Sequence, residues 1–212
     1  LNGAELDPAQ VHADSRIGLD GLSERNELVV VAECAYMTTG EGLHRFVDPV
    51  DGEVYLYSQF EVADSRRVFA VFEQPDLKAK FQFTVTAPAH WTVISNGPTP
   101  EPVPVPGANR NGGRDEAVAV WSFEPTPLLS SYVTAVVAGP YHRETGELTS
   151  SDGRTIPLGV LCRASLAQYL DADRILDVTR AGFGFYEELF ATPYPFSTYD
   201  QIFVPEFNAG AM

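Results

Sequence analysis

The chain has 212 residues, of which 44% are hydrophobic and 20% are charged, and this composition is typical of a globular protein with a hydrophobic core. Its 29 acidic and 14 basic residues give a formal net charge of −15, which argues against nucleic-acid binding because phosphate recognition needs clustered lysine and arginine. The sequence contains no run of about 18 apolar residues and no recognisable signal peptide, so we expect no membrane partner and a cytoplasmic location.

The first part of the chain combines turn-forming and apolar stretches. Asn2-Gly3 predicts a two-residue hairpin turn, and the preceding strand of that hairpin is expected to be missing from a chain that opens on Leu1. Residues 7–26 are polar and rich in turn signals. Glu27–Tyr36 is rich in β-forming residues, and its successive valines, Val29–Val31, predict a strand buried on both faces.

The next residues predict a series of strands. Leu43–Val47 and Val54–Tyr57 flank a turn segment that contains proline and glycine. Lys78–Thr86 alternates apolar and polar residues and predicts a half-buried strand. Trp91–Ser95 follows after a short connection, so we expect these two strands to form a hairpin.

Residues 97–115 are the low-complexity part of the chain, with prolines at every second position from Pro98 to Pro106. Such spacing favours an extended excursion outside any hydrogen-bonded ladder. The runs Ala117–Phe123 and Ser131–His142 complete the β pattern. Up to this point the sequence predicts an antiparallel β domain.

The pattern changes after about residue 143. Thr155–Cys162 predicts a strand, and Ser165 with Gln168 has the form of an N-terminal capping box. Asp171 offers a second start for a longer helix, whose apolar residues follow at helical spacing and which Pro193 ends. The apolar run that follows, ending at Val204, completes a strand–helix–strand order typical of an α+β domain.

The last five residues, Asn208-Ala-Gly-Ala-Met212, contain the stretch that points most directly to a family. They resemble the Gly-Ala-Met-Glu-Asn signature of the zinc aminopeptidase N family, up to its third residue. In that family the signature is a strand beside the active-site cleft, its backbone pairs with an extended peptide substrate, and its Glu holds the substrate's amine. The resemblance implies that the parent protein continues beyond Met212.

Other stretches fit the same family in the same order. Ser58-Gln-Phe-Glu61, followed by Phe72-Glu-Gln-Pro-Asp76, is similar to the family's pattern of a Gln and a nearby acidic residue ahead of a Pro-Asp and a strand. Trp91–Gly97 and Ser131–Gly139 also resemble its N-terminal domain. The resemblance covers residues 27 to 212 and is strongest to the bacterial, actinobacterial-type aminopeptidase N.

The expected fold is therefore mainly β. The resemblance implies an antiparallel, saddle-like β-sandwich domain over residues 1–143, incomplete at its N-terminus. It implies that residues 144–212 are the opening α+β part of a thermolysin-like catalytic domain, cut short at its end.

The resemblance also implies roles for particular residues. Gln59 would line the cleft and contact the first substrate residue, and Glu61 would supply one of the carboxylates around the substrate's ammonium group. Judged from composition alone, Glu61 is a solvated charge at a strand end. Main-chain contacts to the peptide would come from Gly210, Ala211 and Met212, and Ala209 would border the pocket for the first residue. The remaining polar residues near these positions are interpreted as structural: Asp64, Arg66, Arg67, Glu206 and Asn208.

The family's zinc ligands are absent from the sequence. They belong to a His-Glu-x-x-His helix and a Glu on the next helix, whereas the four histidines here form no such motif. We therefore expect no catalytic residue and no metal ligand in this chain, with zinc bound elsewhere in the full-length parent. The four histidines are interpreted as surface or hydrogen-bonded side chains: His12, His44, His90 and His142.

The function implied is that of a fragment of a zinc aminopeptidase that removes N-terminal amino acids from peptides. Its partners would be peptides with a free N-terminus and the rest of the catalytic domain, and the fragment would be inactive alone. Two alternatives stay open. The chain could be a non-catalytic β-sandwich binding module with a self-contained end and no exposed apolar edge at Ile202–Val204, or an inactive relative that serves as a scaffold.

Overall fold

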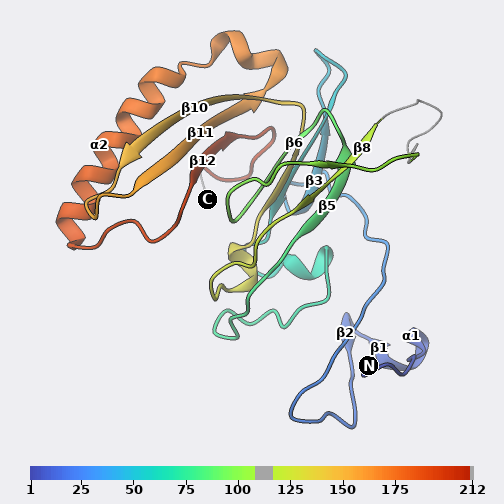
Figure 1. Cartoon of the computed structure of the whole chain (residues 1–212). Coiled ribbons are helices and arrows are strands. Elements are labelled where there is room, and N and C mark those ends of the chain that lie inside the picture. The colour runs from blue at the N-terminus through green and yellow to red at the C-terminus, as the bar shows by residue number, and fades with distance from the viewer. Residues whose placement is uncertain (108–116, 211–212) are drawn as a thin grey trace. The chain divides into compact units, whose positions relative to one another are not determined.

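The computed structural model describes residues 1–107 and 117–210 and contains two compact units, Leu1–Cys34 and Ala35–Met212 (Figure 1). In the first unit, α1 (Pro8–Val11) begins at Asp7, whose carboxylate accepts a hydrogen bond from the Ala9 N–H. The short strands β1 (His12–Ala13) and β2 (Arg16–Ile17) pair in antiparallel fashion. Asn2 and Gly3 have φ angles of 52° and 80°, which confirms the predicted two-residue turn.

The apolar run of residues 27–36 does not form the predicted strand. Val29 and Val31 are 72% and 95% exposed, and Cys34 is exposed as well. A strand buried on both faces needs a neighbour for its backbone and two layers for its side chains. Within the part of the chain that the structure describes, no strand pairs with this run, so the prediction of a buried strand is wrong here.

Two antiparallel sheets form the β-rich part of the second unit. The first contains β3 (Gly42–Val47), β4 (Val54–Gln59), β9 (Val136–Gly139) and β6 (Thr92–Ser95) in that spatial order. The second contains β5 (Thr84–Pro88), β8 (Val118–Ser122) and β7 (Val103–Pro104). Short 3-10 helices, η1 (Ser65–Arg67) and η2 (Ser131–Val133), lie in the connections. This arrangement confirms the mainly β, antiparallel character expected from the sequence.

The two sheets share one core, and this corrects the predicted hairpin of residues 78–86 with 91–95. β5 pairs with β8 in one sheet, whereas β6 pairs with β9 in the other. Side chains from both sheets pack together, which is why the chain changes sheets between β5 and β6. The buried members of this cluster are Leu56, Ala87, Val93, Ala119, Trp121, Phe123 and Ala138.

The proline-rich stretch departs partly from its prediction. Val103 and Pro104 pair with Val120 and Ala119, so a short ladder does form there. β7 is the edge strand of its sheet, where a proline without an N–H is tolerated. The second half of the stretch, residues 108–116, lies outside the described residues.

A third sheet and a long helix follow. β10 (Tyr141–Thr149) and β11 (Thr155–Arg163) form an antiparallel hairpin, and β12 (Tyr199–Phe203) lies parallel to β11 at the edge of the sheet. Between β11 and β12 come the 3-10 helix η3 (Ala164–Tyr169) and the helix α2 (Ala172–Phe190). The predicted strand–helix–strand order is confirmed, including the helix start at Asp171.

The helix α2 covers one face of this sheet (Figure 1). The cluster between helix and sheet contains Leu148, Ile156, Leu158, Val160, Ile175, Leu176 and Phe183. The opposite side of α2 is also apolar, because Val178, Phe185 and Leu189 are between 60% and 66% exposed.

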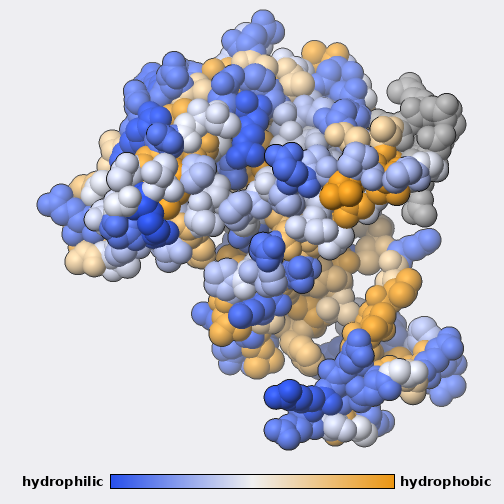
Figure 2. Space-filling view, in the orientation of Figure 1, coloured by the Kyte–Doolittle hydropathy of each residue, from blue (hydrophilic) through white to orange (hydrophobic). Residues whose placement is uncertain are grey.

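The face of the molecule in Figure 2 is largely hydrophilic, with separate hydrophobic areas. None of the helices in the described ranges is long and apolar enough to cross a membrane.

Candidate substrate-binding site

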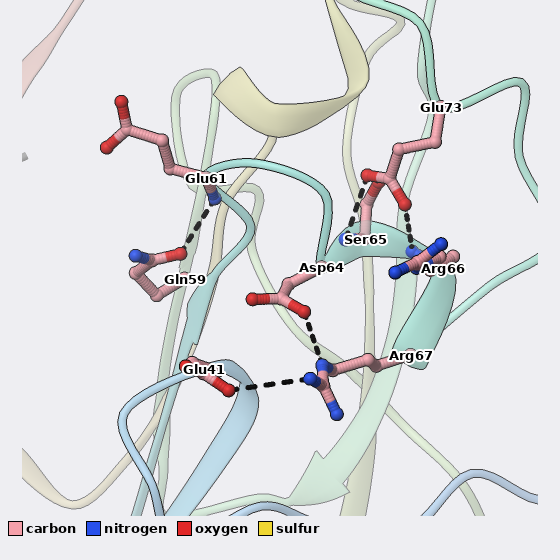
Figure 3. Close-up of polar contacts among 8 residues, drawn as sticks. All are labelled: Glu41, Gln59, Glu61, Asp64, Ser65, Arg66, Arg67 and Glu73. Atoms are coloured by element: carbon pink, nitrogen blue, oxygen red, sulfur yellow. Dashed lines mark hydrogen bonds and ion pairs between the residues drawn. The ribbon is translucent and has the colours of Figure 1, made fainter.

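The end of β4 presents the first two residues predicted for the site. Gln59 is the last residue of β4 and pairs with Gly42 of β3. Its side-chain Oε1 accepts a hydrogen bond of 2.7 Å from the Glu61 N–H, so the amide fixes the backbone that carries Glu61 (Figure 3). The Glu61 side chain is exposed and points away from the neighbouring Asp64–Arg67 pair (Figure 3). Within the described residues, no side chain or backbone group donates a hydrogen bond to the Glu61 carboxylate.

The loop after Glu61 is held by charged side chains. The Arg67 Nε contacts Asp64 Oδ1, and the Arg67 Nη2 lies 3.5 Å from Glu41 Oε2. The hydrogen bond and charge of Asp64, together with the charge of Glu41, raise the pKa of the Arg67 guanidinium. This bears out the interpretation of Asp64 and Arg67 as a salt bridge that supports the loop.

A further acid contributes to the same loop and was not predicted. The Glu73 carboxylate accepts hydrogen bonds from the backbone N–H groups of Ser65 (3.1 Å) and Arg66 (2.9 Å) and from the Ser65 hydroxyl (Figure 3). It thereby satisfies the free donors at the start of η1. Arg66 takes part through its backbone N–H. The sequence gives no signal for this role of Glu73, because Glu73 lies eight residues beyond Ser65 and outside η1.

The segment after β12 docks on the β3–β4 hairpin. The Tyr57 hydroxyl donates a hydrogen bond of 3.2 Å to the Glu206 carbonyl, and the Phe207 ring packs edge-on against Tyr57 at 5.9 Å. Asn208 Nδ2 donates to the carbonyl of Thr39. These contacts confirm that Glu206 and Asn208 have structural roles.

Gly40 shows how closely this segment approaches the hairpin. Its φ of +78° is a conformation that favours glycine, and a Cβ placed there would lie 2.5 Å from Asn208 Nδ2. The loop Thr39–Gly42 therefore contacts Asn208 at one end and, through Gly42, pairs with Gln59 at the other.

This loop connects the two groups of residues predicted for the site. Ala209 and Gly210 follow directly after Asn208 and are exposed, whereas Ala211 and Met212 lie outside the described residues. In the described part of the chain, no hydrogen bond joins Gln59 or Glu61 to Ala209 or Gly210. The structure relates the two groups through the loop Thr39–Gly42 and through Tyr57 of β4, which contacts Glu206 and Phe207.

A buried carboxylate ties the β3–β4 turn to the third sheet. Asp48 is 0% exposed and accepts hydrogen bonds from Arg163 Nη1 (2.8 Å), Ser165 Oγ (2.6 Å) and the Val50 N–H (2.8 Å). Burial raises the pKa of Asp48, but these hydrogen bonds and the charge of Arg163 outweigh it, so the pKa lies below its ordinary value. Ser165 bonds to Asp48 from within η3, so the predicted capping box does not form.

The side chains that the structure describes do not fit a zinc site. His44 Nε2 lies 3.2 Å from Glu206 and His142 Nε2 lies 2.8 Å from Glu144, each beside a single acid. Across residues 1–107 and 117–210, no group of three or more His, Cys, Asp or Glu side chains is placed to hold a metal ion. We therefore derive no chemical step through a metal from these residues.

Comparison with known proteins gives the family. The sequence model of the Peptidase M1 N-terminal domain matches residues 29–133. Aminopeptidase N of Streptomyces lividans is 62% identical over 100% of this chain, which corresponds to 23% of that protein. Aminopeptidase N of Mus musculus is 29% identical over 76% of the chain and 15% of its own length, and Aminopeptidase M1-A of Oryza sativa subsp. japonica is 30% identical over 81% and 18%.

The chain thus spans about a quarter or less of the length of these relatives. The names of these three relatives all describe aminopeptidases. The chain belongs to the M1 aminopeptidase N family, in its actinobacterial type.

Proposed function

We propose that this chain is the N-terminal part of a zinc aminopeptidase that removes N-terminal amino acids from peptides. The observation that carries the proposal is the 62% identity to Aminopeptidase N of Streptomyces lividans over the whole chain. In the longer protein, other residues would hold the zinc ion, which supplies an activated water for hydrolysis. This chain would bind and orient the substrate.

Glu61 is proposed to bind the ammonium group of the substrate. Its carboxylate is exposed, and the described residues provide no competing partner for it. The hydrogen bond from its N–H to Gln59 fixes its position at the end of β4. An ion pair with a protonated amine would favour peptides with a free N-terminus, because an acetylated amine carries no charge. Gln59 would contact the first substrate residue.

The residues from Ala209 to Met212 are proposed to lie along the peptide backbone. Gly210 lets two backbones approach, Ala209 would leave room for the first side chain, and Ala211 and Met212 would continue the main-chain contacts. This role is supported by the anchoring of the preceding residue, Asn208, to Thr39.

The rest of the catalytic domain is the proposed partner of the third sheet. β12 is an edge strand whose Phe203 is 50% exposed, and α2 has an exposed apolar side. Such surfaces favour further pairing and packing over a self-contained end. We propose that residues 144–212 open a thermolysin-like domain, preceded by a β domain over residues 1–143. A cytoplasmic location is part of the proposal, and cell fractionation with an antibody tests it.

The test compares the full-length protein with its Glu61→Gln variant on an alanine anilide and on free and N-acetylated peptides. We expect the full-length protein to hydrolyse the anilide and the free peptides but not the N-acetylated peptides, and we expect a chelator to block this hydrolysis. Losing the ion pair should lower kcat/KM about 30-fold, mainly through KM, which corresponds to about 2 kcal/mol. Glu124→Gln, at an exposed acid of the β domain, is the matched control.

Unchanged KM in Glu61→Gln would contradict the role of Glu61. A zinc-free, inactive full-length protein would contradict the enzymatic proposal and favour the scaffold alternative. This chain alone should be inactive in the same assay.

A further inference from the structure

His44 occupies an unusual position in β3. Its side chain is 0% exposed, and its ring stacks on Tyr57, the residue opposite it in β4, with 4.8 Å between the ring centroids. Nδ1 accepts a hydrogen bond of 2.9 Å from the Gly40 N–H. An imidazole nitrogen that accepts a hydrogen bond carries no proton, so in the neutral ring the proton is on Nε2.

The proton on Nε2 faces the segment that follows β12. Nε2 lies 3.2 Å from Glu206 Oε2, within ion-pair distance although outside hydrogen-bond alignment. Glu206 is the acid that lies within ion-pair distance of this buried N–H. A buried polar atom without a partner costs free energy, so the pairing favours this placement of Glu206.

The backbone at Glu206 is held by the same pair of strands. Glu206 has a φ of 52°, a left-handed conformation that is uncommon for residues other than glycine. The Tyr57 hydroxyl donates to its carbonyl at 3.2 Å. Burial and the charge of Glu206 raise the pKa of Tyr57 to about 12, so this hydroxyl stays protonated and remains a donor at neutral pH.

We propose that His44 and Glu206 are positioning residues, which form a clasp that sets the position of Ala209 and Gly210 relative to Gln59. This inference rests on the proposed aminopeptidase function. The clasp fixes the chain three residues before Ala209, and Asn208 fixes it again at Thr39. The same loop, Thr39–Gly42, pairs with Gln59. Displacements of about 1 Å can lower turnover strongly when reacting groups must be aligned.

The test compares Glu206→Ala and Glu206→Gln in the full-length protein. Glu206 is 57% exposed in its side chain, so neither change should prevent folding. Gln keeps an oxygen that can accept from Nε2–H, and Ala does not. The two substrates are an alanine anilide, which has no peptide backbone after the first residue, and an alanine-led tetrapeptide.

We expect Glu206→Ala to lower kcat/KM about tenfold for the tetrapeptide and less than threefold for the anilide, with the peptide loss in kcat. Glu206→Gln should restore most of the peptide activity. Glu188→Ala, at an exposed acid on α2, is the matched control and should change neither value. Equal losses on both substrates, or a Gln variant as impaired as the Ala variant, would overturn the clasp.

Hydrogen exchange separates this inference from the proposed function. Glu206→Ala should speed exchange in residues 206–210 and 39–42 but not in β8 or β11. If the wild-type protein cleaves neither substrate, the proposed function fails. The exchange result then decides alone, because unchanged exchange rates in residues 206–210 would overturn the clasp.

Discussion

Two apolar runs that look alike in the sequence differ in the structure, because one packs against a core cluster and the other is exposed. Residues 202–204 lie on β12 and just after it, where Ile202 and Val204 pack against a cluster that includes Tyr57 and Leu161. Residues 29–31 are exposed and form no strand. The difference teaches that β-forming residues favour a strand, but that a strand forms only where a neighbouring strand and a facing layer are available to it.

The largest loss of stability is expected from a change in the cluster against which Ile202 and Val204 pack. Leu161, on β11, is 0% exposed and packs against residues of the β3–β4 sheet. Leu161→Ala should lower the free energy of unfolding by about 3 kcal/mol, because it removes buried apolar surface and leaves a cavity. Urea unfolding measures this loss, and Val178→Ala, at a residue 66% exposed, is the control. A loss of stability no greater than that of Val178→Ala would contradict the view that the cluster around residues 202–204 stabilises the protein.

A smaller loss of stability is expected from a change in the loop Thr39–Gly42, which contacts Asn208. Gly40→Ala introduces a side chain at a φ of +78°, against Asn208. It should destabilise the protein by about 2 kcal/mol or release residues 206–210 from the hairpin. Unfolding and limited proteolysis report these two outcomes. Gly52→Ala, which shares a left-handed φ but has open space around it, isolates the contribution of the contact.

A carboxylate holds the segment between α2 and β12, so the stability of the protein should depend on pH. Glu187 accepts hydrogen bonds from Ser150 Oγ (2.5 Å) and from the N–H groups of Ser151 and Tyr194 (both 2.7 Å). The bond from Ser150 is the largest of the contributions that hold the pKa of Glu187 below its ordinary value. Since the folded pKa is lowered, the stabilisation is complete above the ordinary pKa of about 4.3 and is lost as pH falls through the folded value.

Glu187→Gln should therefore weaken the protein at pH 7 by less than Leu161→Ala does, and the variant and the wild type should converge in stability as the pH falls below the lowered pKa of Glu187 in the folded protein. Chemical denaturation at several pH values measures the difference. A gap between variant and wild type that stays constant down to low pH would show that the charge of Glu187 has no part in it.

The smallest effect is expected in the exposed run. Val31→Lys should change the free energy of unfolding by less than about 0.5 kcal/mol, because Val31 is 95% exposed. A loss of 2 kcal/mol or more would mean that the run is buried in the protein in solution, and the contrast with residues 202–204 would disappear. The same unfolding assay serves for both regions.

Local patterns allowed the element types to be predicted well. The alternation of Phe81, Phe83 and Val85 with polar residues appears in the structure as half-buried and exposed positions, although the predicted strand Lys78–Thr86 begins only at Thr84. Helix α2 starts after its N-cap Asp171 as expected, yet Val178, Tyr186 and Phe190 are exposed. Helical spacing identifies a helix, but α2 is apolar on two sides, and spacing cannot say which side meets the sheet.

Contacts between distant residues could not be predicted. Ser165 bonds to Asp48 across 117 positions, and Glu73 holds a helix start outside its own element. For the candidate site, the resemblance supplied Gln59, Glu61 and Ala209–Met212, and their roles stay predictions. His44 was interpreted only as a surface or hydrogen-bonded histidine, because its neighbours Gly40 and Glu206 are set by the fold.

The buried bond network of Asp48 has a consequence for how this chain could be divided. Its two side-chain donors, Arg163 and Ser165, lie beyond the proposed domain boundary at residue 143. A shortened protein that ended at this boundary would leave the carboxylate without its counter-charge and with only the Val50 N–H. We therefore expect the residues on the two sides of this boundary to unfold together, as one cooperative unit.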